Sequence, residues 1–140
     1  MIRVFEETDL DKIVQIWLDA SIIAHDFIPS TYWKEKAEDM RNLYLPASKT
    51  FVYQTDTVIL GFISMVDNYI AAIFVNPESQ GQGIGKQLIE YIKKQHTLIT
   101  LGVYSKNIRS IDFYKRQGFV IINEKIEENT GEFETLMELQ

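Results

Sequence analysis

The chain has 140 residues, of which 46% are hydrophobic and 12% aromatic, and its formal net charge is −6. This length and composition predict one globular domain over residues 1–140, long enough to bury a core. The absence of cysteine excludes disulfides, thiolate catalysis and cysteine–zinc sites. No apolar run approaches the length of a membrane span, and the first residues do not resemble a signal peptide, so we expect a cytoplasmic protein. The negative charge argues against a broad nucleic-acid surface and mildly favours a cationic partner.

The first part of the chain predicts a short strand followed by two helices. Ile2 and Val4 indicate the strand. The next helix begins after a cap at Thr8-Asp9 and keeps an apolar stripe to about residue 24. Residues 25–29 end in proline and break it. A second helix, opened by Ser30 or Thr31, is predicted over residues 32–44.

The remainder of the chain predicts six more strands and two more helices. Apolar runs bounded by turn residues mark the strands, at residues 50–54, 58–66, 69–75, 98–103, 119–127 and 132–139. The helices follow residue 83 and residue 107. The resulting order βααβββαβαββ predicts an α+β fold with a central, mostly antiparallel sheet flanked by four helices.

A glycine-rich segment, Gln-Gly-Gln-Gly-Ile-Gly-Lys at residues 80–86, lies between a predicted strand and a predicted helix. The first N–H groups of a helix lack internal partners and lie at its positive end, and glycines let an anion approach them. The segment therefore predicts a phosphate-binding site. It does not match the P-loop pattern, because Gln80 and Gln87 stand where glycine and a hydroxyl residue are required. It does not match the dinucleotide fingerprint either, because Lys86 or Leu88 stands where the last glycine is required.

The pattern that does fit is Q/R-x-x-G-x-G/A, with Gln80, Gly83 and Gly85, and it resembles the acetyl-CoA loop of the GNAT family of N-acetyltransferases. A second segment, residues 107–119, resembles the later motif of that family, N-x-x-A/S-x-x-F/L-Y-x-x-x-G-F. By its residues alone, this segment predicts a helix capped at its start by asparagine and ended by glycine. The two motifs occur in the order and at the spacing of the family. Because the family domain is about as long as this chain, the resemblance covers nearly all of it.

The resemblance implies an acetyl-CoA-dependent N-acetyltransferase that moves the acetyl group to a primary amine by direct attack in a ternary complex. The acceptor would be a protein lysine, a protein N-terminus or a small amine, with acetyl-CoA as cosubstrate, no metal, and a monomeric or homodimeric enzyme. In the family the loop backbone binds the pyrophosphate, and the pantetheine arm lies along the preceding strand like an extra strand. The residues thereby implied to bind acetyl-CoA are Ile73, Phe74, Val75, Gln80, Gly81, Gln82, Gly83, Ile84, Gly85, Lys86 and Asn107.

Tyr114 matches the family tyrosine that serves as general acid toward the cofactor sulfur. An unperturbed phenol has a pKa of about 10, so at neutral pH it holds a proton to donate. Asn107 would orient the pantetheine arm, cap the helix, or do both. The acceptor side is expected at the junction of the first two helices, with residues 25–28 and Trp33.

The general base stays open at the level of sequence. Relatives that acetylate protein N-termini often carry glutamate in a Leu-Glu-Val context, but here Gly102 stands at that position. A water relay is one possibility, and the side chains that could serve instead are Asp67, Tyr69, Tyr104 and His25. The missing carboxylate also leaves a second function open, a CoA-binding regulatory module without catalysis. A nucleotide-binding protein is disfavoured by the mismatched loop patterns.

Overall fold

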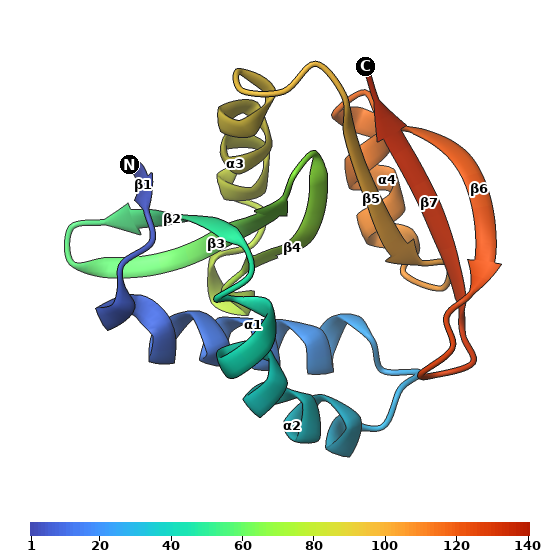
Figure 1. Cartoon of the computed structure of the whole chain (residues 1–140), viewed down its shortest axis with the longest axis horizontal. Coiled ribbons are helices and arrows are strands. Elements are labelled where there is room, and N and C mark those ends of the chain that lie inside the picture. The colour runs from blue at the N-terminus through green and yellow to red at the C-terminus, as the bar shows by residue number, and fades with distance from the viewer.

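The computed structural model describes all 140 residues and has seven strands and four α-helices (Figure 1). The strands are β1 (Ile2–Val4), β2 (Lys49–Thr55), β3 (Val58–Val66), β4 (Tyr69–Val75), β5 (Ile99–Tyr104), β6 (Val120–Ile126) and β7 (Phe133–Leu139). The helices are α1 (Leu10–Ala24), α2 (Ser30–Asp39), α3 (Ile84–Lys93) and α4 (Ile108–Arg116). The predicted order of elements and the α+β class are confirmed. None of the helices is long and apolar enough to cross a membrane.

The sheet has the strand order β1-β2-β3-β4-β5-β7-β6, and every neighbouring pair is antiparallel except β4 and β5. This parallel pair is aligned at two positions only, Tyr69 with Thr100 and Ile70 with Leu101. Beyond them the two strands diverge, as Figure 1 shows. Because β4 stays paired with β3 as far as Val75, its other edge has no strand partner from residue 71 to residue 75.

A β-bulge in β4 changes the direction of its side chains just where β5 departs. Ala72 is opposite Ser64 and Ile70 is opposite Met65, so Ala71 is the extra residue. Ile70 packs in the apolar core beneath α3 and α4, whereas Ala72 packs in the core beneath α1 and α2. The bulge therefore lets one short strand contribute to both faces of the sheet.

The two cores lie on opposite faces of the sheet. Beneath α3 and α4, the side chains of Leu88, Ile89 and Ile92 are completely buried, at the helical spacing seen in the sequence. Beneath α1 and α2, Ile13, Ile16, Trp17 and Trp33 are buried. Together they fix α1 and α2 on one side of the diverging strands and α3 and α4 on the other.

The second helix differs from its prediction at both ends. It begins at Ser30 with Pro29 in the cap position, and no side chain caps it. It ends at Asp39 and continues as a π-helical turn, Met40–Tyr44, in which the N–H of Leu45 donates to the carbonyl of Met40. The wider turn brings the side chains of residues 40 and 45, both buried, toward the same side, which an α-helix would not do.

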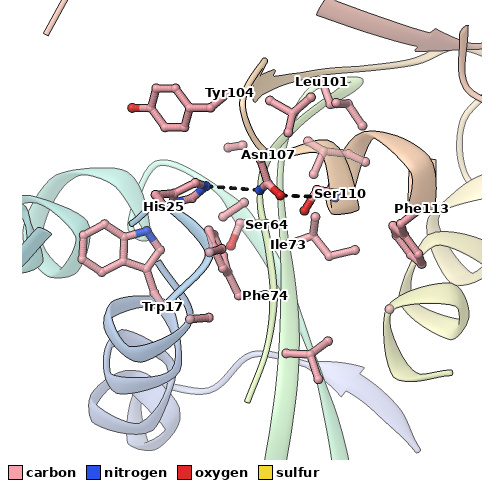
Figure 2. Close-up of a pocket in the computed structure, with 18 of the residues that line it drawn as sticks. Trp17, His25, Ser64, Ile73, Phe74, Leu101, Tyr104, Asn107, Ser110 and Phe113 are labelled. Carbon is pink, nitrogen blue, oxygen red and sulfur yellow. Dashed lines mark hydrogen bonds between the residues drawn. The ribbon is translucent and has the colours of Figure 1, made fainter. Parts of the chain in front are cut away.

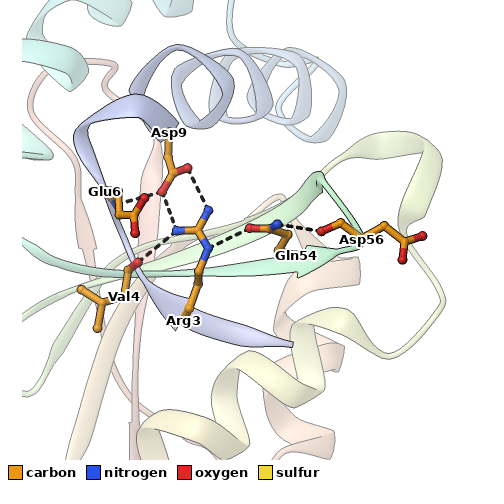
Figure 3. A network of polar contacts seen from close by, with 6 residues as sticks. All are labelled: Arg3, Val4, Glu6, Asp9, Gln54 and Asp56. Atoms are coloured by element: carbon orange, nitrogen blue, oxygen red, sulfur yellow. Dashed lines mark hydrogen bonds and ion pairs between the residues drawn. The ribbon is translucent and has the colours of Figure 1, made fainter.

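Asp9 does not cap α1 through its side chain, contrary to the prediction for Thr8-Asp9. Its two carboxylate oxygens instead bind the guanidinium of Arg3 at 2.8 and 2.9 Å, and one of them also accepts from the N–H of Glu6 (Figure 3). Arg3 in turn donates to the side chain of Gln54 at 2.7 Å. The hydrogen bonds from Arg3 lower the pKa of the Asp9 carboxyl. This network fastens β1 to the entry of α1 and to the end of β2.

Candidate functional site

A large cleft of ≈ 1030 Å³ is lined by β4, β5, the glycine-rich loop, the first turn of α3, one side of α4, parts of α1 and α2, and the final hairpin of β6 and β7. It includes the opening where β4 and β5 diverge. Tyr114 lines it, as do all the residues predicted to bind the cofactor except Gln82. Gln82 is exposed and its side chain is not part of the cleft wall. The predicted site residues, which are spread from residue 73 to residue 114, thus line one cleft.

The glycine-rich loop presents free backbone N–H groups to this cleft. Gly81 and Gly83 have φ angles of +80° and +84°, a conformation that favours glycine. Gly83 is the cap residue of α3, and no side chain caps the helix there. A Cβ added at either glycine would meet no atom within 4 Å, so the space before the helix end is open. The positive end of α3 therefore fits an anionic group such as a diphosphate.

Gly85 is required for a different reason. A Cβ at this position would lie 3.1 Å from the ring of Phe113, so the absence of a side chain lets α3 and α4 approach closely. Gln80 holds the loop to the preceding strand, because its side-chain amide donates to the carbonyl of Val75 at 3.2 Å. These two contacts fix the loop between the end of β4 and the start of α4.

The free edge of β4 offers backbone donors and acceptors to an extended ligand. Residues 72–75 are paired with β3 on one side, and on the side toward β5 they line the cleft. Unpaired backbone groups at a sheet edge can bind an extended chain as an added strand. The pantetheine arm of coenzyme A carries two amide groups, so this edge fits it.

Asn107 connects the two sides of the cleft (Figure 2). Its Oδ1 accepts from the N–H of Ser110 at 3.2 Å and caps α4, as predicted. Its Nδ2 therefore faces the Nε2 atom of His25, 3.4 Å away, in a buried contact between residues 82 positions apart. Because Nδ2 can only donate, Nε2 accepts, and the neutral imidazole carries its proton on Nδ1.

His25 lies in an aromatic cluster at the end of α1. Its ring centre is 5.0 Å from that of Trp33, 5.1 Å from that of Tyr104 and 5.8 Å from that of Phe27. The side chain is 7% exposed, and this burial lowers the pKa of the imidazole to about 4. The expectation that residues 25–28 and Trp33 adjoin the cleft is met for His25 and Trp33, which both line it.

Tyr114 lies on α4 with its ring in the core beneath that helix, next to the rings of Phe113 and Phe119. It is 9% exposed and reaches the cleft wall. Burial, and to a smaller extent the charge of an ionised Tyr69, raises the pKa of its hydroxyl. The phenol therefore keeps its proton at neutral pH.

The geometry disfavours three of the side chains considered as general base. Asp67 lies in the β3–β4 turn and lines a separate hollow with His96. The hydroxyl of Tyr104 donates to Glu127 at 3.1 Å, and burial raises its pKa. The accepting nitrogen of His25 is already engaged by Asn107.

Two carboxylates of the cleft were not singled out in the sequence, Glu127 and Glu134 of the final hairpin. In the sequence they belong to an acidic hairpin segment that matches no catalytic motif. Only the pairing of β7 with β5 brings Glu134 opposite Tyr104 and next to Gly102. A local motif cannot predict this placement, because it depends on the register between β5 and β7, which pairs residues 30 positions apart, Tyr104 and Glu134.

Comparison with known proteins gives a consistent result. Residues 21–139 match the family model described as the acetyltransferase (GNAT) domain. The chain is 36% identical over 124 residues to peptidyl-lysine N-acetyltransferase YiaC of Escherichia coli K12, an alignment that covers 88% of this chain and 85% of YiaC. The solution structure of apo-form YjaB from Escherichia coli has the same fold, with a TM-score of 0.88 at 23% identity over 99% of this chain and 95% of that one. A putative streptothricin acetyltransferase from Bacillus anthracis, solved in complex with acetyl coenzyme A, matches with a TM-score of 0.61 at 26% identity, over 68% of this chain and 63% of that one.

In the folded protein, the imidazole of His25 should have a pKa far below the ordinary value for histidine. We expect ring-nitrogen NMR to show a neutral imidazole protonated on Nδ1 down to about pH 5, with a pKa of about 4. Because the unfolded-state pKa is ~6.5, the stability that burial of this neutral ring contributes is present above pH ~6.5 and is lost as the pH falls toward 4. A His25→Gln variant assigns the resonances. Titration near pH 6.5, or a proton on Nε2, would contradict the arrangement of His25 and Asn107.

Proposed function

This chain belongs to the GNAT acetyltransferase family and is an acetyl-CoA-dependent N-acetyltransferase, and on that premise we propose that its acceptor is the side-chain amine of protein lysine. The relative YiaC, named as a peptidyl-lysine N-acetyltransferase, supports this choice. The alternative of a CoA-binding module without catalysis loses its basis, because the carboxylate missing at residue 102 is not the only one available to the cleft.

The observation that carries the proposal is the chemistry of the cleft wall formed by α2, β5 and the final hairpin. The rings of Tyr32, Trp33 and Tyr104 lie there together with the carboxylates of Glu127 and Glu134. An alkylammonium group is attracted both by carboxylates and by aromatic faces. A lysine side chain combines that ammonium with an apolar stem, which the rings can contact.

The anionic cofactor needs positive charge around it, and other elements of the cleft supply this charge. Four cations line the cleft, and three of them come from α3 and α4: Lys86, Arg109 and Arg116. The fourth, Lys36 of α2, lies 4.0 Å from the carboxylate of Asp39 on the same helix. We propose that the N-terminal backbone of α3 binds the diphosphate of acetyl-CoA, with the cations of α3 and α4 around it, and that the free edge of β4 binds the pantetheine arm. Asn107 would then orient that arm while it caps α4.

Bound acetyl-CoA supplies an activated acetyl thioester. Tyr114 holds its proton at neutral pH because burial raises the pKa of the phenol, and it donates this proton to the sulfur as the C–S bond breaks. The aromatic wall keeps water from the reacting groups and holds the acceptor amine toward the opening between β4 and β5.

Tyr114→Phe removes the hydroxyl and keeps the ring that packs against Phe113 and Phe119. We expect kcat to fall about 10²-fold or more while the Kd for acetyl-CoA stays near that of the wild type, because the acid acts only during transfer. Steady-state kinetics and calorimetry measure the two quantities. Tyr91→Phe, which alters a tyrosine that packs on Phe51 in the same core and does not line the cleft, is the matched control. Undiminished turnover by Tyr114→Phe would remove this residue from the mechanism.

The acceptor class is tested with the wild-type protein, acetyl-CoA and a panel of amines. The panel contains a lysine peptide with a blocked N-terminus, a lysine-free peptide with a free N-terminus, and spermidine. We expect thiol release to be faster with the lysine peptide by about tenfold or more in kcat/KM, with mass spectrometry locating the acetyl group on the side chain. Faster reaction of the free N-terminus or of spermidine would contradict lysine as the acceptor and leave the acetyltransferase activity intact.

A further inference from the structure

We propose that Glu134 of β7 is the general base of this acetyl transfer, supplying from a neighbouring strand the carboxylate that Gly102 cannot carry. The inference rests on the proposed acetylation of an amine and adds the residue that prepares the amine for attack.

The register of β5 and β7 places this carboxylate. Gly102 is opposite Leu136 and Tyr104 is opposite Glu134, so residues 102, 104, 134 and 136 share one face of the sheet. The side chain of Glu134 turns back toward the glycine. Its Oε2 lies 2.6 Å, and its Cδ 2.9 Å, from the point where a Cβ on Gly102 would stand. A side chain at residue 102 would therefore displace the carboxylate of Glu134 from this position.

The surroundings of Glu134 leave one of its oxygens available. The side chain is 20% exposed and lines the cleft. Oε1 forms a long ion pair with Lys125 of β6, at 3.7 Å, whereas Oε2 is the oxygen that faces Gly102. The same point beside Gly102 is 3.2 Å from the hydroxyl of Tyr69, which stands at the parallel end of β4. The free oxygen thus lies where β4 and β5 begin to diverge.

The neighbouring phenols cannot take this role. Burial and the charge of Glu134 raise the pKa of Tyr69, and burial raises the pKa of Tyr104 and of Tyr114. All three hold their protons at neutral pH. Glu134, by contrast, presents its Oε2 atom beside Gly102, away from the ion pair that Oε1 forms with Lys125. The cleft therefore has separate groups for the two proton transfers, a carboxylate on the sheet and a phenol on α4.

The lysine arrives as an ammonium, and Glu134 accepts one proton from it, directly or through one water. The freed nitrogen lone pair forms the new C–N bond at the acetyl carbon, the C–S bond breaks with its electron pair on sulfur, and Tyr114 gives the sulfur a proton. The new amide loses its second proton, which restores the phenol, and Glu134 releases the first proton to solvent.

Glu134→Gln keeps the shape of the side chain and removes its basicity. With acetyl-CoA and the blocked lysine peptide, we expect kcat to fall about 10²-fold or more with unchanged acetyl-CoA affinity. The matched control is Glu132→Gln on the same hairpin. The side chain of Glu132 is 21% exposed, about as much as that of Glu134, and its carboxylate pairs with Lys106 at 3.1 Å. Glu132 does not line the cleft. The control should turn over like the wild type.

The pH profile separates a base from a merely structural carboxylate. Without its base, the variant can use only acceptors already deprotonated in solution, so its kcat/KM should rise about tenfold per pH unit from pH 7 to 9, because lysine has a pKa of ~10.4. The wild-type profile should be flatter. The groups facing Glu134 are Lys125 of β6, Tyr69 of β4 and Tyr104 of β5. A Glu134→Gln variant as active as Glu132→Gln, or a loss of rate that is the same at every pH, would overturn the proposal.

A carboxylate exchange keeps the proposal testable if Glu134→Gln folds poorly. Gly102→Glu combined with Glu134→Ala moves the carboxylate from β7 to β5 and removes the clash beside the glycine. We expect the double variant to exceed Glu134→Ala in kcat by about tenfold or more. A folded double variant no faster than Glu134→Ala would count against Glu134 as the base. Failure of the wild type to release thiol with any amine would instead overturn the proposed function itself.

Discussion

The short parallel contact between β4 and β5 is the constraint on which the rest of the structure depends. Two aligned residue pairs hold the strands together at Tyr69 and Ile70, and the strands then separate. The separation leaves the backbone of β4 without a partner on one side and opens the sheet between its two cores. A fully paired sheet would have no such edge and no passage between its faces. The loss of several ladder hydrogen bonds thus creates the cleft.

Charge is divided between the walls of this cleft in a way that suits a two-substrate reaction. The uncapped start of α3 and the cations of α3 and α4 favour an anion. On the other wall Glu127 and Glu134 of the final hairpin favour a cation, and the one lysine there, Lys36, is paired with Asp39. His25 and Asn107 connect the two walls through one buried contact, and the low pKa of the histidine keeps a positive charge out of that contact. The arrangement fits an anionic acetyl donor and a cationic amine acceptor brought to one opening.

Local pattern was enough to predict the order of the elements, the α+β class and the residues that surround the glycine-rich loop. These features follow from periodicity and from motifs contained within short segments, as at residues 80–86. The π-helical turn after Asp39 and the ion pair of Asp9 with Arg3 could not be predicted, because they are set by packing and by side-chain partners in other elements. The same holds for Glu134, whose position beside Gly102 exists only in the register of two strands. The sequence identified the missing carboxylate but not its replacement.

The claim that the open, left-handed glycines before α3 bind the diphosphate of acetyl-CoA is tested most directly by calorimetry on Gly83→Val. Gly131, in the β6–β7 hairpin, offers a matched comparison, because it also has a positive φ, +74°, and open space around an added Cβ. Both variants carry the same kind of backbone strain, but only one places a side chain before the helix. We expect the Kd for acetyl-CoA to rise about 100-fold or more in Gly83→Val and to stay near the wild-type value in Gly131→Val. Equally tight binding by the two variants would contradict the claim.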